Sequence, residues 1–445
     1  MIPVDLDHVA EVAGGAVHGD GSRLVNSVVI DSRKAAAGAL FAALAGEHVD
    51  GHEFAAAAID AGATAILASR PLDVPCVVVD NVTDALAALA RDNLTRTTAA
   101  VVGVTGSQGK TSVKDLLAHV LGASGPTIAP TGSFNNELGV PLTVLRADAA
   151  TRFLVVEMGA RGIGHIAELC DIASPSIGVV LNVGSAHIGE FGSAEAIAEA
   201  KGELVEALPA DGTAVLNADD PLVSAMASRT RARVFTFGHA GELGLGDVSL
   251  DELGQPHFTL SHDATTVEVH VPQIGAHHAI NAAAAAAAAM AAGLDLETIA
   301  VRLTSATATS PMRMEHHVRA DGLVVINDAY NANPESMAAA LRAVAGLGRG
   351  PVAVLGEMLE LGDAAYDAHL QVGRLAAELG YARVVAVGPG AAAIAEGAGQ
   401  VGEAVADVDT AVDLLSASLR ADDLVVVKAS RGARLERVAQ ALLAR

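Results

Sequence analysis

The chain has 445 residues, which is more than one hydrophobic core usually supports, so two or three domains are expected. Its 52 acidic residues outnumber 28 basic ones and leave a net charge of −24, which argues against a protein that binds nucleic acid or anionic membranes. Only two cysteines occur, Cys76 and Cys170, and both lie in apolar runs, so neither a disulfide framework nor a thiolate metal site is expected. A reducing compartment fits this usage.

No targeting segment is expected at the N-terminus. It carries Asp5 and Asp7 and lacks the basic residues and apolar core of a signal peptide, so we expect a cytoplasmic protein. The alanine-rich stretch at 279–293 is shorter than the roughly 20 residues that span a bilayer. It predicts a closely packed helix instead of membrane insertion.

Residues 1–98 predict a small α/β domain. Short apolar strands are expected at 24–30 and 76–80, and alanine-rich helices at 53–61 and 83–94. This apolar pattern ends near Ala99, where a different pattern of strands and helices begins.

Residues 99–312 predict a central domain in which each apolar strand is followed by a loop and a helix. The strands are AAVVGVT, RFLVVEMG, SIGVVLNVG and GTAVLNAD. Because these runs are apolar throughout, both faces of the sheet should be covered, which is typical of a parallel sheet wound with helices. Residues 265–271 do alternate and, with HFTLS before them, predict an antiparallel hairpin at the sheet edge.

Residues 313–445 restart the strand and helix pattern. The strands are GLVVIND, PVAVLGE, ARVVAVG and DLVVVKAS, and helices are expected near 334–345, 363–380 and 431–444. This pattern predicts a second doubly wound, Rossmann-like domain. The expected fold class is therefore α/β with three domains.

A phosphate-binding loop is predicted where the strand AAVVGVT meets the helix VKDLLAHVL. The connection reads TGSQGKTS and would present backbone N–H groups and the positive end of a helix to phosphate oxygens. Lys110 would reach the terminal phosphates, and Thr111 would offer its hydroxyl to Mg²⁺. Val104 stands where the longer P-loop pattern has a glycine, so the fit is to GxxGKT, and an ordinary strand-to-helix turn is the alternative. The loop residues expected to bind the nucleotide are Gly106, Ser107, Gln108, Gly109, Lys110, Thr111 and Ser112.

Other polar residues follow predicted strands. Glu157 closes a buried strand, where it could bind Mg²⁺, cap a helix or form an ion pair. His187 lies in a glycine-flanked loop and could bind a metal or cap that loop, whereas Lys201, taken alone, would be a surface lysine. Asp328, Tyr330, Asn331 and Asn333 follow a later strand and suggest either a ligand crevice or an asparagine-rich turn before a helix.

Several motifs in order along the whole chain resemble the Mur ligase family. They are TGSQGKTS, FNNELGVP, VVEMGA, AHIGEFGS followed by AKGE, GAHHAINAAAA, DAYNANPES, LGEMLELGDAAYDAH and VKASRGARLE. The resemblance implies that ATP phosphorylates the carboxylate of a UDP-linked muramoyl peptide. An amine would then attack the acyl phosphate, giving an amide, ADP and phosphate.

The C-terminal motifs most resemble the branch of the family that adds D-alanyl-D-alanine to UDP-MurNAc-tripeptide. This implies a role in peptidoglycan synthesis, and with it in cell-wall growth, cell shape and division. The Asp-Asn-Pro-Arg sequence of the diamino-acid-adding MurE ligases does not occur. The alternatives are a MurE-type or folylpolyglutamate-synthase-like ligase with another acceptor, or a non-catalytic nucleotide-binding member. The joint presence of the P-loop lysine and the proposed metal ligands argues against the last.

The resemblance also implies roles for individual residues. Thr111 and Glu157 would hold a first Mg²⁺, and His187 and a carbamylated Lys201 a second, with Lys110, His187 and Lys201 as the catalytic residues. The further ATP contacts would be Asn281, Arg313, Asp328, Tyr330 and Asn331. The UDP-substrate contacts would be Asp31, Ser32, Arg33, Asn135 and Asn136. The dipeptide contacts would be Lys428, Ser430 and Arg431, for which a structural helix cap is the alternative.

Two positions depart from the family pattern. The usual His-Asn pair is His277-His278, and the usual Pro-Gly-Arg hinge is Pro311-Met312-Arg313, which keeps the arginine and lacks the flexible glycine. We still expect the C-terminal domain to close about residues 309–316, because an exposed acyl phosphate would hydrolyse. The protein is expected to act as a monomer on small-molecule substrates, without nucleic acid.

Overall fold

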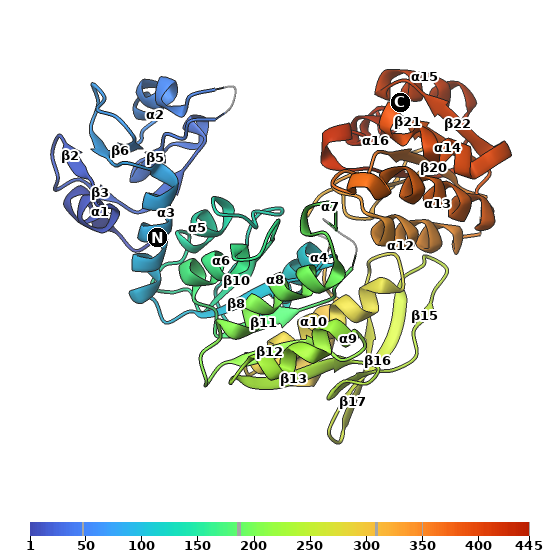
Figure 1. The fold of residues 1–445 in the computed structure, drawn as a ribbon, viewed down its shortest axis with the longest axis horizontal. Coiled ribbons are helices and arrows are strands. Elements are labelled where there is room, and N and C mark those ends of the chain that lie inside the picture. The colour runs from blue at the N-terminus through green and yellow to red at the C-terminus, as the bar shows by residue number, and fades with distance from the viewer. Residues whose placement is uncertain (47–48, 185–187, 308–309, 349, 445) are drawn as a thin grey trace.

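The computed structural model describes residues 1–46, 49–184, 188–307, 310–348 and 350–444. Figure 1 shows three α/β units in chain order, with the central unit between the other two. Within the described residues no helix is long and apolar enough to cross a membrane. The predicted α/β class with three units is confirmed.

The N-terminal unit is built on a five-stranded sheet in the order β2-β7-β6-β5-β4, in which only β2 runs antiparallel to its neighbour. The elements of this unit are β1 (Val4–Asp5), α1 (Leu6–Ala13), β2 (Ala16–His18), β3 (Leu24–Val25), β4 (Ser27–Val29), β5 (Ala39–Ala42), α2 (Ala55–Asp60), β6 (Ala65–Ala68), β7 (Cys76–Val78) and α3 (Val82–Thr95). The single strand predicted at 24–30 is wrong. The chain changes partners at Asn26, so β3 pairs with β1 whereas β4 pairs with β5.

The central unit holds a ten-stranded sheet in the order β15-β16-β14-β13-β12-β11-β8-β10-β9, with β17 paired to β16. Its strands are β8 (Ala100–Thr105), β9 (Thr127–Ile128), β10 (Phe153–Glu157), β11 (Ile177–Val180), β12 (Thr213–Asn217), β13 (Arg233–Gly238), β14 (Leu243–Leu245), β15 (Ser249–Leu250), β16 (Pro256–His262) and β17 (Thr265–His270). The strands from β9 to β14 are parallel, and β16 and β17 form an antiparallel hairpin. Both predicted features of this sheet are confirmed.

The register of the central sheet places the predicted motifs at one edge. Strand β8 lies between β10 and β11, with Val104 opposite Glu157 and Thr105 opposite Val180. The loop that follows β8 is therefore flanked by the carboxyl ends of two neighbouring strands. In open parallel sheets this edge is where ligands bind.

Helices cover both faces of the central sheet (Figure 1). They are α4 (Lys110–Leu121), α5 (Gly139–Val144), α6 (His165–Ala173), α7 (Ile188–Phe191), α8 (Ala194–Glu206), α9 (Pro221–Ser224), α10 (His277–Ala291) and α11 (Leu296–Thr304). The alanine-rich stretch forms α10, which packs against α4 and against strands of the sheet. Every residue from Ala282 to Ala289 is buried, because side chains no larger than a methyl let the helix approach its neighbours closely.

The C-terminal unit has a six-stranded sheet in the order β18-β19-β23-β20-β21-β22, parallel except for β18 at the edge. Its strands are β18 (Glu315–Val318), β19 (Val324–Asp328), β20 (Val352–Gly356), β21 (Arg383–Val387), β22 (Gly402–Val405) and β23 (Leu424–Lys428). Its helices are α12 (Pro334–Ala345), α13 (Ala365–Glu378), α14 (Ala392–Ala398), α15 (Val408–Ser418) and α16 (Glu436–Leu443). The first helix begins at Pro334 as predicted, with Asn333 as its cap.

The linker between the central and C-terminal units is anchored at its start and wound in an unusual conformation. Ser310 is held by α4, because its N–H donates to the Asp115 carboxylate at 3.1 Å and its hydroxyl accepts from the buried Lys114 ammonium at 3.2 Å. Met312 and Met314 have φ values of 57° and 50°. This left-handed region favours glycine, so the position where the family pattern has glycine is occupied by a strained methionine.

The packing of α10 leads to a first prediction. Ala284→Leu should lower the free energy of unfolding by about 1–3 kcal/mol, because the larger side chain has no space against α4 and the sheet. Chemical denaturation followed by circular dichroism measures the change. The matched control is Ala57→Leu on α2, where the residue is exposed and the same substitution should be nearly neutral. An equal loss in both variants would contradict the close packing of α10.

Candidate active site

A cleft of about 800 Å³ lies between the central and C-terminal units. Its lining includes the predicted P-loop, Glu157 and Lys201 from the central unit, and Arg313 and Tyr330 from the C-terminal side. Residues 31–33 of the N-terminal unit are not among those that line it. The structure thus brings together most of the residues expected to contact ATP and metal.

The P-loop has the geometry of a phosphate cradle. Gly109 precedes α4 with a φ of 83°, and a Cβ there would lie 2.5 Å from Oδ1 of Asn281, so only glycine fits. The Lys110 ammonium folds back over the loop and donates to the carbonyl of Gly106 at 2.6 Å. Burial lowers the pKa of Lys110, the charge of Glu157 opposes this effect, and Arg313 adds to it. The ammonium is therefore placed to be neutralised by phosphate oxygens.

Asn182, two residues after the end of β11, contacts the P-loop and was not predicted from the sequence. Its side-chain carbonyl accepts from the backbone N–H groups of Ser107 and Gln108, both at 3.0 Å, and its amide donates to the carbonyl of Gln108 at 3.2 Å. These bonds fix the first turn of the P-loop and leave the N–H groups of the following residues for phosphate. Its position could have been found, because it directly follows an apolar strand beside the P-loop strand.

Hydroxyl and carboxylate oxygens gather at the start of α4. The Thr111 hydroxyl donates to Glu157 at 2.9 Å, lies 2.9 Å from the hydroxyl of Ser133 and accepts from Arg313 at 3.1 Å. The other Glu157 oxygen accepts from Asn135 at 2.8 Å. These are the hard oxygen ligands that Mg²⁺ prefers. The single hydrogen of the Thr111 hydroxyl goes to Glu157, so an ion at Thr111 would take the place of Ser133 or Arg313 as its partner. The donor set therefore fits the implied Mg²⁺. Ser133 was not predicted.

Lys201 is buried in the cleft wall, contrary to its surface appearance in the sequence. It lies on α8 with 5% of its surface exposed. Burial, together with the nearby charge of Lys110, lowers the pKa of Lys201 to about 7. A large fraction of the amine is then neutral near physiological pH, which is the form that can add carbon dioxide. His187, the expected partner of Lys201 at the second metal, lies outside the described residues.

The C-terminal side of the cleft supplies an aromatic face and a buried ion pair. The guanidinium of Arg313 lies over the ring of Tyr330, 4.4 Å from its centroid. The Lys428 ammonium donates to Asp328 at 2.6 Å and to the carbonyl of Asn331 at 2.9 Å. Asp328 also accepts from the N–H of Met314 at 3.1 Å, so it holds the linker in place. Lys428 is thus already paired at its proposed dipeptide position.

The histidine pair that departs from the family pattern lies at the cleft. The rings of His277 and His278 are 4.3 Å apart. Burial lowers the pKa of His277 to about 4, despite the nearby Asp328, so its ring is neutral at pH 7. Both ring nitrogens of buried His278 lack a hydrogen-bond partner among the described residues. Since buried polar groups are usually satisfied, a bound molecule is the natural partner for them. Asn281 also lines the cleft.

Only some of the residues predicted to contact the UDP-substrate line the cleft. Arg33 is exposed and pairs with Asp31 at 2.9 Å, and Asp31 caps a short helix over Ser32–Lys34. Asn136 lines the cleft and also accepts from the N–H of Gly139 at 2.9 Å, next to α5.

The proposed dipeptide contacts beside Lys428 also line the cleft. The Ser430 hydroxyl accepts from Leu359 N–H at 3.1 Å. Arg431 pairs with Glu436 at 3.1 Å. Their substrate roles remain predictions.

Family profiles match three consecutive parts of the chain. The one described as Mur ligase family, catalytic domain, covers residues 24–119, Mur ligase middle domain covers 104–289, and Mur ligase, glutamate ligase domain, covers 312–431. The UDP-N-acetylmuramoyl-tripeptide--D-alanyl-D-alanine ligase of Mycobacterium tuberculosis is 46% identical, over 100% of this chain and 98% of that protein. The chain belongs to the Mur ligase family. The resemblance inferred from the motifs is confirmed.

Solved structures agree with this assignment. A crystal structure of MurF from Acinetobacter baumannii matches this Mur ligase with a TM-score of 0.89 at 30% identity, covering 100% of this chain and 99% of that one. MurF from Thermotoga maritima in complex with ADP matches with a TM-score of 0.80 at 30% identity, covering 94% and 97%. This Mur ligase is therefore an enzyme of the ligase class, and one of its structural relatives has been solved in complex with ADP.

The Asn182 contacts predict a loss of ATP use when they are removed. Asn182→Ala should lower kcat/KM for ATP about 10- to 100-fold, because the P-loop loses three side-chain hydrogen bonds that fix its shape, and Ser107 N–H keeps only the backbone carbonyl of residue 182. Steady-state kinetics measures this. The control is Asn81→Ala, which removes the exposed cap of α3 in the N-terminal unit and should leave KM for ATP unchanged. An unaltered kcat/KM in Asn182→Ala would contradict the positioning role.

The burial of Lys201 should lower the free energy of unfolding of the native protein. In buffers free of carbon dioxide and below about pH 7, Lys201→Met should raise the free energy of unfolding by on the order of a few kcal/mol, because it removes a buried charge. The gain should shrink as the pH rises from about 7 toward 10.5, since the native lysine is neutral there whereas the unfolded one still binds a proton.

Denaturation at several pH values measures the Lys201 effect, with exposed Lys34→Met as the control. A gain that stays constant across this pH window would show that the folded lysine keeps an ordinary pKa.

Proposed function

We propose that this Mur ligase adds D-alanyl-D-alanine to UDP-N-acetylmuramoyl-tripeptide through an acyl phosphate, giving the UDP-linked pentapeptide, ADP and phosphate. The structural observation that best supports this chemistry is the Thr111–Glu157 contact beside Lys110, in a cleft that Arg313 lines from the C-terminal side. The acceptor rests on the whole-length relative at 46% identity whose name states these substrates. The motif DAYNANPES and the lack of Asp-Asn-Pro-Arg support the same choice.

The first step joins two anions, the peptide carboxylate and the terminal phosphate of ATP, so positive charge must be in place before they meet. Lys110 would release the carbonyl of Gly106 and donate to the phosphate instead. The N–H groups at the start of α4 would hold the remaining phosphate oxygens. Thr111 and Glu157 would hold Mg²⁺, which neutralises the charge that develops during phosphoryl transfer.

Lys201 would contribute to a second Mg²⁺ position as a carbamate. The neutral amine is favoured by burial and by the charge of Lys110, and addition of carbon dioxide turns it into a carboxylate-like oxygen donor. We include His187 in this position on the resemblance alone. Labelled bicarbonate should give a carbamate signal by nuclear magnetic resonance in the native protein and none in Lys201→Met.

The C-terminal unit would protect the acyl phosphate from water. Arg313 reaches from the C-terminal end of the linker to the hydroxyls of Thr111 and Ser133, at 3.1 and 3.4 Å, so it connects this unit directly to the P-loop. Tyr330 lines the cleft, and the ring face that Arg313 does not cover would offer a flat apolar surface for the adenine. The cytoplasmic location and the monomeric state are part of this proposal and rest on the sequence and the resemblance.

The function is tested by phosphate release from ATP and Mg²⁺ with UDP-MurNAc-tripeptide. D-alanyl-D-alanine, meso-diaminopimelate and glutamate are supplied in separate reactions. Release should require the tripeptide together with D-alanyl-D-alanine, and Lys110→Ala should reduce it by about 1,000-fold or more. Thr111→Val should also lose activity, whereas Thr111→Ser keeps the hydroxyl and should retain most of it.

Each other outcome has a distinct meaning. Release with diaminopimelate or glutamate would keep the chemistry and overturn the acceptor. Tight ATP binding without release in any reaction would support a non-catalytic member and overturn the proposal as a whole.

A further inference from the structure

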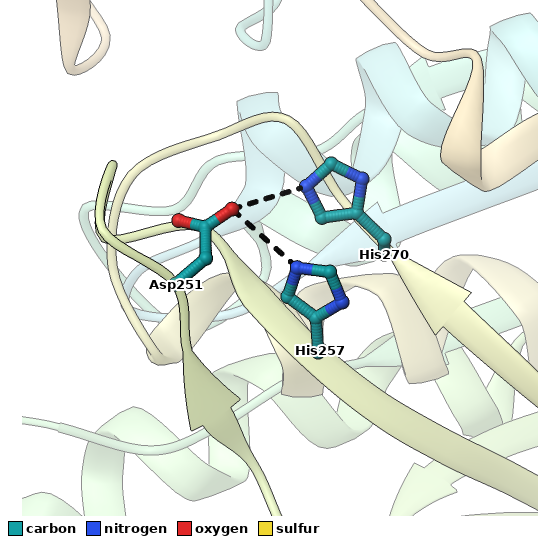
Figure 2. Close-up of side chains that lie close together, drawn as sticks. All are labelled: Asp251, His257 and His270. Carbon is teal, nitrogen blue, oxygen red and sulfur yellow. Dashed lines mark hydrogen bonds and ion pairs between the residues drawn. The ribbon is translucent and has the colours of Figure 1, made fainter.

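Three side chains with metal-binding groups meet on the antiparallel edge of the central sheet, and none of them lines the cleft. Asp251 directly follows β15, His257 lies near the start of β16, and His270 ends β17. The two histidines are directly opposite each other in the β16–β17 hairpin, so their side chains share one face of the sheet. Figure 2 shows both rings pointing a nitrogen toward the Asp251 carboxylate.

The spacing of these groups is close to that of a metal site. Oδ2 of Asp251 lies 3.4 Å from Nε2 of His257 and 3.8 Å from Nε2 of His270, and the three groups all lie within 4.8 Å of one another. Tetrahedral zinc at about 2.0–2.1 Å from nitrogen and oxygen ligands requires separations of about 3.4 Å between them. The distances are therefore close to those of a zinc site, and the two stacked rings would have to tilt toward each other for both nitrogens to point at one ion.

The surroundings orient the ligands. The other Asp251 oxygen, Oδ1, accepts from the N–H groups of Leu253 and Gln255, each at 2.9 Å, which leaves Oδ2 directed at the histidines. The two rings stack with centroids 4.4 Å apart and an interplanar angle of 20°. The two backbone bonds to Asp251 are the kind of second-shell contact that holds a metal ligand in position. The side-chain oxygen of Gln255 lies 2.8 Å from Nε2 of His270, the nitrogen that would bind the ion, so a metal would have to displace Gln255 from it.

We propose that Asp251, His257 and His270 form a binding site for Zn²⁺, or for a divalent transition metal of similar preference, separate from the magnesium positions of the cleft. Two imidazoles and one carboxylate suit zinc, whereas Mg²⁺ prefers oxygen ligands alone. The side chains of His257, His270 and Asp251 are 49%, 30% and 31% exposed, so an ion can enter and water can complete its coordination. A hydrogen-bonded triad without any metal is the competing explanation, and the experiment below separates the two.

The loop that follows Asp251 also contacts the C-terminal unit. Gly254, in the loop that follows Asp251, approaches the C-terminal unit so closely that a Cβ on it would lie 2.9 Å from Leu347. The carbonyl of Gly254 also accepts from the N–H of Gly275 at 2.8 Å, just before α10. An ion bound to Asp251 would therefore stiffen the loop on which Leu347 rests.

The test is a zinc titration of the full chain after treatment with a chelator, without nucleotide and with Mg²⁺ in excess to cover the cleft. One equivalent of Zn²⁺ should bind and should raise the melting temperature. His257→Ala and Asp251→Asn should weaken this binding by about 100-fold or more, since loss of an outer-shell partner alone typically costs 10- to 100-fold. The control is His18→Ala, which removes an exposed histidine of β2 and should leave binding unchanged. Cobalt substituted for zinc should give the absorption of a tetrahedral ion.

Two results would overturn the site. Zinc binding of equal affinity in His257→Ala, Asp251→Asn and the native chain would place the ion elsewhere, and Thr111→Val would then reveal whether it occupies the cleft. A native chain that takes up no zinc at millimolar concentration would leave the triad as a hydrogen-bonded group only. Melting curves of the metal-free variants establish that each one is folded before binding is compared.

Discussion

The hydroxyl of Thr111 is the point on which the rest of the site depends. It joins the start of α4, the end of β10 through Glu157, and the C-terminal side through Arg313. The contact with Glu157 exists because β8 and β10 are adjacent and parallel and end together. A shift of one residue in that pairing would turn the carboxylate to the other face of the sheet. The proposed Mg²⁺ position thus depends on strand register.

Much of the site could be predicted from local sequence patterns, whereas the remaining residues are brought to it by tertiary packing. The P-loop could be predicted because a strand, a glycine turn and a helix follow one another in the chain. Lys201 could not be recognised as buried, because its neighbours on α8 include glutamates and alanines that also suit an exposed helix. Asn182 and Ser133 came from loops whose approach to the P-loop depends on strand order. The prediction of one strand at 24–30 was wrong because the hydrophobic pattern of the sequence does not reveal that the chain changes its pairing partner at Asn26.

The cleft concentrates groups that a stable core would avoid. Lys110 and Lys201 lie near each other, and burial lowers the pKa of both amines. The buried pair of Lys428 and Asp328 adds a further desolvated contact. The compensating apolar packing lies nearby, in the alanine helix α10 and its contacts with α4. Functional sites commonly break local rules that the surrounding structure then offsets.

The linker brings a mechanical consequence. Two methionines held at positive φ cost about 1–3 kcal/mol each, and their N–H groups are clamped by Glu315 and Asp328 at 3.1 Å. A glycine at position 312 would adopt the same φ without strain, so the linker would store no such energy. With methionine the strained conformation persists only while the contacts to Glu315 and Asp328 hold it. If the expected closure breaks these contacts, it also relieves backbone strain in the linker.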